Sequence, residues 1–204
     1  MNTFYPSPKI APRIISSGSR HSILLSDVIF KVRSEEPIEF IDLTDQINRH
    51  LLEHGIRNGT ATVFSRHTTA AIKINEAEEL LLEDFKQMLR RLCPVEHDYH
   101  HNDMSRRKPP IAPDERPNAH SHCMHLLLST SETVPVVESK LALGTWQRIF
   151  MVELDGPRER EVHLRCHSYL APGFELEIPA NGNGNGHGAR SGGFTEPYRN
   201  GGAK

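Results

Sequence analysis

Apolar residues recur at helical spacing in the middle of the chain. From residue 80 to residue 92, leucine, phenylalanine and methionine return every three or four positions, until Pro94 ends the pattern. Residues 75–78 resemble a capping box with Asn75 in the cap position, so a helix is expected to begin there. Two shorter helices are expected at residues 46–53 and 120–128.

Alternating apolar and polar residues predict strands in much of the remaining chain. Residues 60–66 and 68–74 are both extended in character and follow one another closely, so they are expected to be neighbouring strands. Further strands are expected at residues 21–32, 40–43, 131–138, 140–154 and 160–170. Because helices and strands do not alternate regularly, the pattern predicts an α+β fold, with an antiparallel sheet and a few packed helices in a single domain.

Glycine and proline divide the chain of 204 residues into three parts. Residues 1–20 are expected to be an N-terminal arm, residues 21–178 the domain, and residues 179–204 a disordered tail rich in glycine and asparagine. Inside the domain, residues 94–117 form a long irregular stretch with many prolines. A loop of this length in a compact domain is commonly functional, and we expect the same here.

Charge and cysteine content narrow the class of protein. The formal net charge is −2, which gives no basic field for nucleic acid or for an anionic membrane surface. Apolar runs are too short to span a membrane as helices. The three widely spaced cysteines favour a reducing compartment, and prolines interrupt the N-terminal stretch where a signal peptide is apolar. A cytoplasmic protein is expected, with the nucleus left open.

Histidine is unusually abundant, with 13 residues. They concentrate at His67 between two expected strands, at His97, His100 and His101 in the long loop, and at His120, His122 and His125 on the third helix. Imidazole is the commonest metal ligand in proteins. The sequence therefore predicts a divalent-metal site, with zinc or a similar ion held by His101, His120 and His122, and no organic cofactor. The alternative is that the loop histidines are simply solvated.

Polar groups beside His67 suit an anionic or phosphorylated ligand. Arg66, Thr68 and Thr69 offer a guanidinium and two hydroxyl groups within four consecutive residues of the sequence. Further along, Gln147 and Glu153 differ by six positions and therefore share one face of a straight strand. Trp146 precedes this pair and is either a core residue or part of a site.

Several familiar catalytic patterns are missing from the sequence. It contains no phosphate-binding P-loop, no dinucleotide fingerprint, no zinc-protease HExxH motif and no GxSxG nucleophile elbow. These absences argue against the nucleotide hydrolases and dinucleotide oxidoreductases that carry such motifs.

Seven ordered motifs carry a resemblance to a known family. They are HTTAA at 67–71, INE at 74–76, YHHND at 99–103, NAHSH at 118–122, PVV at 135–137, LALGTWQ at 141–147 and ELDGPR at 153–158. Together they resemble the YjbQ family, also called the secondary thiamine-phosphate synthase family. The resemblance runs from about residue 21 to residue 167.

The resemblance implies a homotrimer of compact α+β subunits. It also implies an activity that joins an aminopyrimidine diphosphate to a thiazole phosphate, so a small phosphorylated metabolite is the expected partner. His67, His101 and His122 match the family's histidine positions. The expected catalytic residues are His67, Asp103, Gln147 and Glu153, and the expected substrate-binding residues are Arg66, Thr68, Thr69, Asn75 and Trp146.

The sequence also allows a non-catalytic reading, in which the trimer binds a small metabolite or phosphate without turning it over. The chain departs from the family pattern at Ala119, Ser129 and Ser139, and it lengthens the loop before His120. These departures bear on loop geometry and substrate entry more than on the fold.

Overall fold

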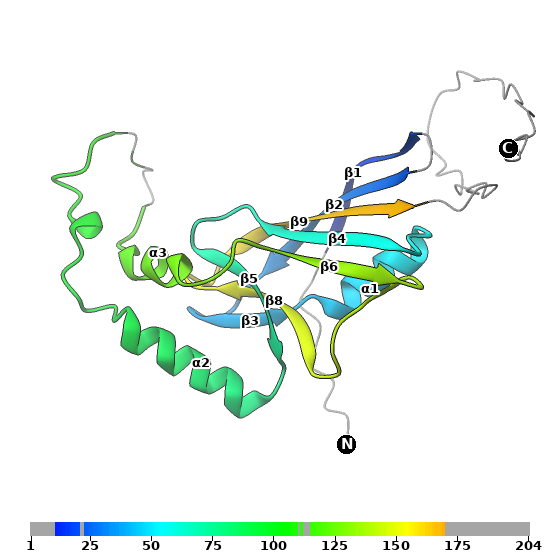
Figure 1. The fold of residues 1–204 in the computed structure, drawn as a ribbon. Helices are drawn as coiled ribbons and strands as arrows, with labels where there is room; N and C mark the ends of the chain where they lie inside the picture. The colour runs from blue at the N-terminus through cyan, green and yellow to red at the C-terminus, as the bar shows by residue number, and fades with distance from the viewer. Residues whose placement is uncertain (1–10, 21–22, 110, 112–114, 170–204) are drawn as a thin grey trace, which may run out of the picture. The chain divides into compact units, whose positions relative to one another are not determined.

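The computed structural model describes residues 11–20, 23–109, 111 and 115–169. The tail expected at residues 179–204 lies outside this range. Within the described residues the fold is α+β with entirely antiparallel pairing, as the sequence predicted. The described part of the chain forms two sheets and three α-helices (Figure 1).

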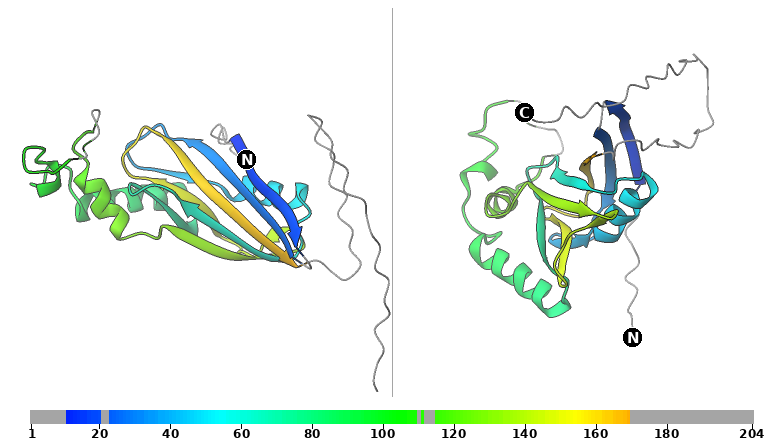
Figure 2. Two further views of the ribbon diagram at one scale, coloured as in Figure 1. Left: turned by 90° about the horizontal axis from the view of Figure 1, so that it is seen from above. Right: turned by 45° about the vertical axis from the view of Figure 1, so that its right-hand side comes forward.

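The larger sheet has six strands in the order β1-β2-β9-β4-β6-β7. Its members are β1 (Ala11–Arg20), β2 (Ile23–Arg33), β4 (Gly59–Ser65), β6 (Ser131–Val137), β7 (Lys140–Leu141) and β9 (Glu159–Tyr169). The long strands β2 and β9 pair along eleven residues and run side by side in both views of Figure 2. Residues 11–20 of the expected N-terminal arm pair with β2 as an edge strand of this sheet.

The smaller sheet has three strands in the order β3-β8-β5. These are β3 (Glu39–Asp42), β5 (Ala70–Glu76) and β8 (Gln147–Glu153). The expectation that residues 60–66 and 68–74 form neighbouring strands is wrong, because β4 and β5 belong to different sheets. The segment expected as one strand at 140–154 is likewise divided between β7 and β8, which lie in different sheets.

The helices are α1 (Thr44–Glu53), α2 (Glu79–Leu92) and α3 (Ala119–Leu126), with a short 3₁₀ helix at His100–Asn102. The predicted cap of α2 is wrong: Asn75 lies in β5, and the Glu78 carboxylate accepts the N–H groups of Leu80 and Leu81 instead. A carboxylate at this position satisfies two free amide groups and favours the helix dipole.

Strand β8 divides the core into two layers. Phe150, Val152 and Leu154 turn one way and join a cluster with Leu89 of α2 and Met124 of α3. The alternate face carries Ile149, Met151 and Glu153, all fully buried. Since Glu153 contacts residues of β9 and of the loop after β2, this second face is turned toward the six-stranded sheet.

Candidate functional site

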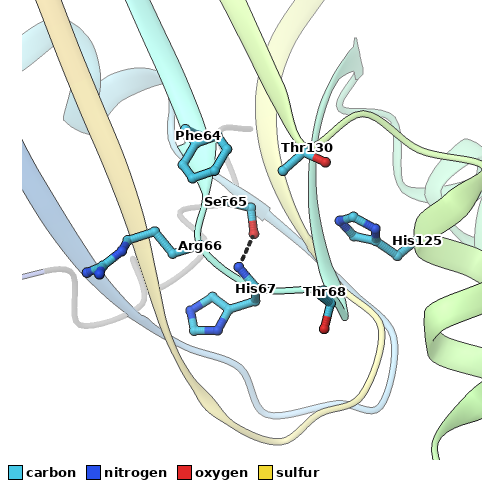
Figure 3. A pocket seen from close by; sticks show the side chains of 7 residues that line it. All are labelled: Phe64, Ser65, Arg66, His67, Thr68, His125 and Thr130. Carbon is cyan, nitrogen blue, oxygen red and sulfur yellow. Dashed lines mark hydrogen bonds between the residues drawn. The ribbon is translucent and has the colours of Figure 1, made fainter.

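The His67 turn joins β4 to β5 at the point where the chain passes from one sheet to the other. Ser65, which is buried, donates a hydrogen bond of 2.5 Å to the Ala70 carbonyl and accepts the His67 N–H at 3.3 Å (Figure 3). The Leu154 N–H also donates to the Thr69 carbonyl at 3.1 Å, so the residue that follows β8 supports the turn. These bonds hold His67 in one place without using its ring.

The imidazole of His67 has one nitrogen committed to the backbone. Nε2 accepts the Glu161 N–H of β9 at 2.8 Å. A nitrogen that accepts this bond carries no proton, so the ring is neutral and its proton is on Nδ1. Burial, followed by the nearby Arg160 guanidinium, lowers the pKa of His67 below its ordinary value. His67 is therefore a fixed N–H donor, and the same bond keeps Nε2 from acting as a base.

A buried ion pair lies beside the turn. Glu153 is fully buried, and its carboxylate receives two bonds from Arg160, at 2.7 and 2.5 Å, and one from Ser34 at 2.9 Å. The N–H groups of Leu154 and Asp155 add two more. With five donors around it, Glu153 has its oxygen atoms occupied within the protein. Its placement is that of a group that supports the turn rather than one that meets a ligand.

A pocket of about 350 Å³ opens in front of the turn. It is lined by Phe64, Ser65, Arg66, His67, Thr68, His125 and Thr130 (Figure 3). His125 approaches from α3, opposite the strand that carries Phe64 (Figure 3). Arg66 is half exposed and forms an ion pair of 2.5 Å with Glu161. The volume is within the range of small-metabolite sites.

The two expected threonines have different places. Thr68 is exposed and lines the pocket. Thr69 is buried, and its hydroxyl accepts a bond of 3.0 Å from Arg160. Thr68 is thus placed to meet a ligand, whereas the Thr69 hydroxyl is engaged by the buried ion pair.

Two of the expected metal ligands come together. The rings of His101 and His122 meet edge to face, with centroids 5.0 Å apart. His101 Nε2 is buried without a hydrogen-bond partner, and so is Nδ1 of His120. Burial lowers the pKa values of His120 and His122, which favours the neutral form that binds metals. Within the described residues, however, no three His, Cys, Asp or Glu side chains converge on one metal position.

Three expected site residues, Asn75, Trp146 and Gln147, lie at the end of the smaller sheet that is away from Glu153. Gln147 begins β8 and pairs with Glu76 of β5, the neighbour of Asn75, whereas Glu153 ends β8 six residues later. Six residues of extended chain span about 20 Å. Gln147 and Glu153 share a face, but buried Ile149 and Met151 lie between them, so they do not form one polar surface. Trp146 is 70% exposed and is not a core residue.

Several expected polar groups are engaged locally. Gln147 accepts the Gly144 N–H at 2.8 Å, and Asn75 accepts the Glu76 N–H at 2.9 Å. Asp103 accepts two bonds from Ser105, and these lower the pKa of its carboxyl group. Within this chain, Asp103, Gln147, Asn75 and Trp146 are not among the residues lining the His67 pocket.

Sequence reasoning missed His125, Phe64 and Arg160 as parts of the site. His125 belongs to the third histidine cluster of the sequence, and its spacing of three from His122 places both on one face of α3. Phe64 and Arg160 gave no signal, because each is an ordinary alternating strand residue whose importance depends on what the fold places beside it.

Known proteins resemble this chain in sequence and in fold. Residues 28–168 match the family model described as UPF0047 protein YjbQ-like. The chain belongs to the YjbQ family. A curated UPF0047 protein of Methanothermobacter thermautotrophicus is 44% identical over 65% of this chain and 85% of its own length. A second, from Archaeoglobus fulgidus, is 40% identical over 66% of this chain and 96% of its own.

Solved structures show the same fold. A YbjQ-like protein of unknown function from Sulfolobus solfataricus P2 superposes with a TM-score of 0.64 at 33% identity, over 72% of this chain and 99% of its own. A hypothetical protein from Aeropyrum pernix K1 gives a TM-score of 0.60 at 38% identity, over 68% and 95%. These YjbQ relatives carry no described activity in their names. As for membranes, no described helix is both long and apolar enough to cross one.

Proposed function

We propose that this YjbQ chain binds a small phosphorylated metabolite in the His67 pocket and acts as a transferase on it. The reaction that its family resemblance suggests joins an aminopyrimidine diphosphate to a thiazole phosphate. In that reaction a carbon–oxygen bond to the diphosphate breaks, a carbon–nitrogen bond to the thiazole forms, and diphosphate leaves. The leaving group gains negative charge, so donors fixed in advance around it accelerate the step.

The single observation that carries the proposal is the fixed state of His67. Because Nε2 accepts the Glu161 N–H, Nδ1 holds a proton in a position set by the protein before any ligand arrives. Arg66 lies next to it at the pocket and supplies a positive charge. A phosphate oxygen that reaches Arg66 competes with Glu161, its present partner. An N–H donor beside a guanidinium matches the needs of a phosphate or diphosphate group.

The direct test is thiamine phosphate formation by the purified protein with saturating aminopyrimidine diphosphate and thiazole phosphate. An enzyme of ordinary efficiency turns over at roughly 1 per second or more. We expect His67→Ala to lower kcat/KM by about 100-fold, because a fixed transition-state donor is lost. His67→Asn, whose side-chain amide can donate from near the Nδ1 position, is expected to recover part of this loss.

The matched control is His97→Ala, since His97 is an exposed loop histidine that does not line the pocket. It is expected to behave as wild type. Equal activity of wild type and His67→Ala would contradict the proposal. Tight binding of both substrates with only trace turnover would instead support the non-catalytic binding protein.

A divalent metal at the loop is a second proposal, favoured by the buried Nε2 of His101, which lies beside His122 and has no hydrogen bond. The Glu115 carboxylate is 3.9 Å from this nitrogen. Two imidazoles fall short of the three or four ligands that zinc takes. In a homotrimer, a neighbouring copy is the source we propose for the missing donors. Zinc titration of wild type, His101→Ala and His122→Ala tests this: both variants are expected to lose the binding, and unchanged zinc affinity in both would refute it.

A further inference from the structure

Two consecutive residues of β9 act on His67 from different sides. Glu161 offers its backbone N–H to the ring, and Arg160, the residue before it, turns its side chain into the protein, where it is 5% exposed. The backbone N–H of Glu161 points sideways within the plane of the sheet, whereas the side chain of Arg160 points to one face of it. One short piece of backbone therefore fixes both the ring of His67 and a buried positive charge beside it.

The guanidinium of Arg160 has no freedom to reach a ligand. It binds both oxygens of Glu153 and also donates to the Thr69 hydroxyl at 3.0 Å. Thr69 is two residues beyond His67 in the same turn. Arg160 thus connects the turn to both sheets. The Glu153 carboxylate that holds its guanidinium is itself fixed by hydrogen bonds from Ser34 and from the N–H groups of Leu154 and Asp155.

The charges around His67 act in opposing directions. Arg160 is the strongest charge that disfavours protonation of the ring, with a smaller effect from Arg66. Glu153 and Glu161 favour protonation. Burial of the ring lowers the pKa of His67 more than any of these charges does. Taken with the Glu161 N–H bond, the balance keeps the pKa of His67 low.

We infer that Arg160, braced by Glu153, is the positioning residue that keeps His67 as a neutral ring presenting Nδ1–H to the pocket. This inference rests on the proposed role of His67 as a donor. Arg160 touches neither the pocket nor the ligand in this scheme; it acts through the ring. Loss of Arg160 would let the ring protonate at Nε2, which breaks the Glu161 bond and releases the imidazole from its fixed orientation.

The test is an NMR titration of the His67 ring in the ligand-free full-length protein, because ring nitrogen shifts report both tautomer and pKa. Wild type is expected to show the Nδ1–H form and a pKa below the ordinary histidine value. Arg160→Gln is expected to raise the pKa of His67, and Glu153→Gln is expected to lower it further. A purely structural role would not move the two variants in opposite directions.

Arg160→Gln leaves a buried carboxylate without its partner and is the variant at risk of not folding. The double variant Arg160→Gln/Glu153→Gln removes both charges and avoids this. It differs from Glu153→Gln only at Arg160, so the pKa of His67 must be higher in the double variant. Arg165→Gln is the matched control, since Arg165 lies outward on the same strand and pairs with Asp27, and His67 is expected to titrate as in wild type.

Two results would overturn the inference: an Nε2–H tautomer in wild type, or equal pKa values in Glu153→Gln and the double variant. Both are read without substrate. A protein that makes no thiamine phosphate but shows the expected titrations would refute the proposed reaction and leave the positioning role intact. Where activity is present, the acidic limb of the kcat/KM profile is expected to move upward in pH in Arg160→Gln.

Discussion

A buried histidine away from the pocket makes the protein sensitive to acid. His50 of α1 is 4% exposed, its Nε2 lies 3.0 Å from the Ser26 hydroxyl, and its ring stacks on His54 with centroids 4.0 Å apart. Phe30 contacts it edge on. Burial, with a smaller effect from His54, lowers the pKa of His50 to about 4. The perturbation to test is His50→Gln, which keeps a polar group near Ser26 but does not titrate.

The size of the effect follows from linkage between protonation and folding. In the unfolded chain His50 takes up a proton below its ordinary pKa of about 6.5, whereas in the folded chain it stays neutral until about pH 4. The unfolded state therefore binds more protons between these values, and folding stability falls as the pH falls through this window. For this one group the loss is about 2 kcal/mol at pH 5 and about 3 kcal/mol at pH 4, relative to pH 8.

The assay is urea unfolding followed by far-ultraviolet circular dichroism at pH 8, 6 and 5, at one protein concentration. We expect wild type to lose about 2 kcal/mol more between pH 8 and pH 5 than His50→Gln does. Other histidines titrate in both proteins, so the difference between them isolates His50. The exposed His97→Gln serves as control and should follow wild type. The reasoning fails if His50→Gln shows the full acid-induced loss.

Three further substitutions test packing and backbone geometry. Ser139 has a φ of 61°, so Ser139→Gly should relieve a left-handed strain and raise the free energy of unfolding by about 0.5–1 kcal/mol; a decrease in urea midpoint would contradict this. Met124→Ala should lower the free energy of unfolding by about 2–5 kcal/mol, because Met124 of α3 is fully buried against the smaller sheet. A decrease of less than about 1 kcal/mol would argue against that packing. Gly156→Ala should abolish soluble expression or lower the melting temperature sharply, because an added Cβ would lie 2.1 Å from the Glu36 carbonyl oxygen. A melting curve like that of wild type would refute this close approach of the Glu36 backbone to Gly156.

Local pattern predicted the elements well because they follow from side-chain periodicity. The apolar repeat at residues 80–92 predicted α2, and alternation predicted strands over β2, β4, β6 and β9. The errors lie where a tertiary contact overrides local preference. Asn75 is a good cap in isolation, but pairing of Glu76 with Gln147 extends β5 past it, so the helix begins later and Glu78 caps it.

The sequence indicated the central residue of the candidate site, His67, but not the buried groups that fix its turn. His67 was indicated by its place between two expected strands and by the guanidinium and hydroxyl groups of its neighbours Arg66, Thr68 and Thr69. That Glu153 is enclosed could not be read from the sequence, since its role depends on Arg160, Ser34 and two amide groups that the fold brings together. The sequence also placed Gln147 and Glu153 on the same face of one strand, and they do share it. They are six residues apart, however, so they lie in different environments and do not form one site.

The site forms where the chain crosses between the sheets. One crossing is the turn from β4 to β5, which carries His67, and another is the segment from β8 to β9, which follows Glu153 and leads to Arg160. The Leu154 N–H donates a hydrogen bond to the Thr69 carbonyl in the β4–β5 turn. The Leu154 carbonyl accepts a hydrogen bond from the Ser121 hydroxyl of α3. Three separate segments therefore meet through Leu154, and α3, which the Ser121 bond anchors, carries His125 into the lining of the same pocket as His67. Because backbone bonds and a buried ion pair fix this junction, substitutions of Thr68 or Arg66 on the pocket side should alter the proposed binding of a phosphorylated ligand far more than the free energy of unfolding.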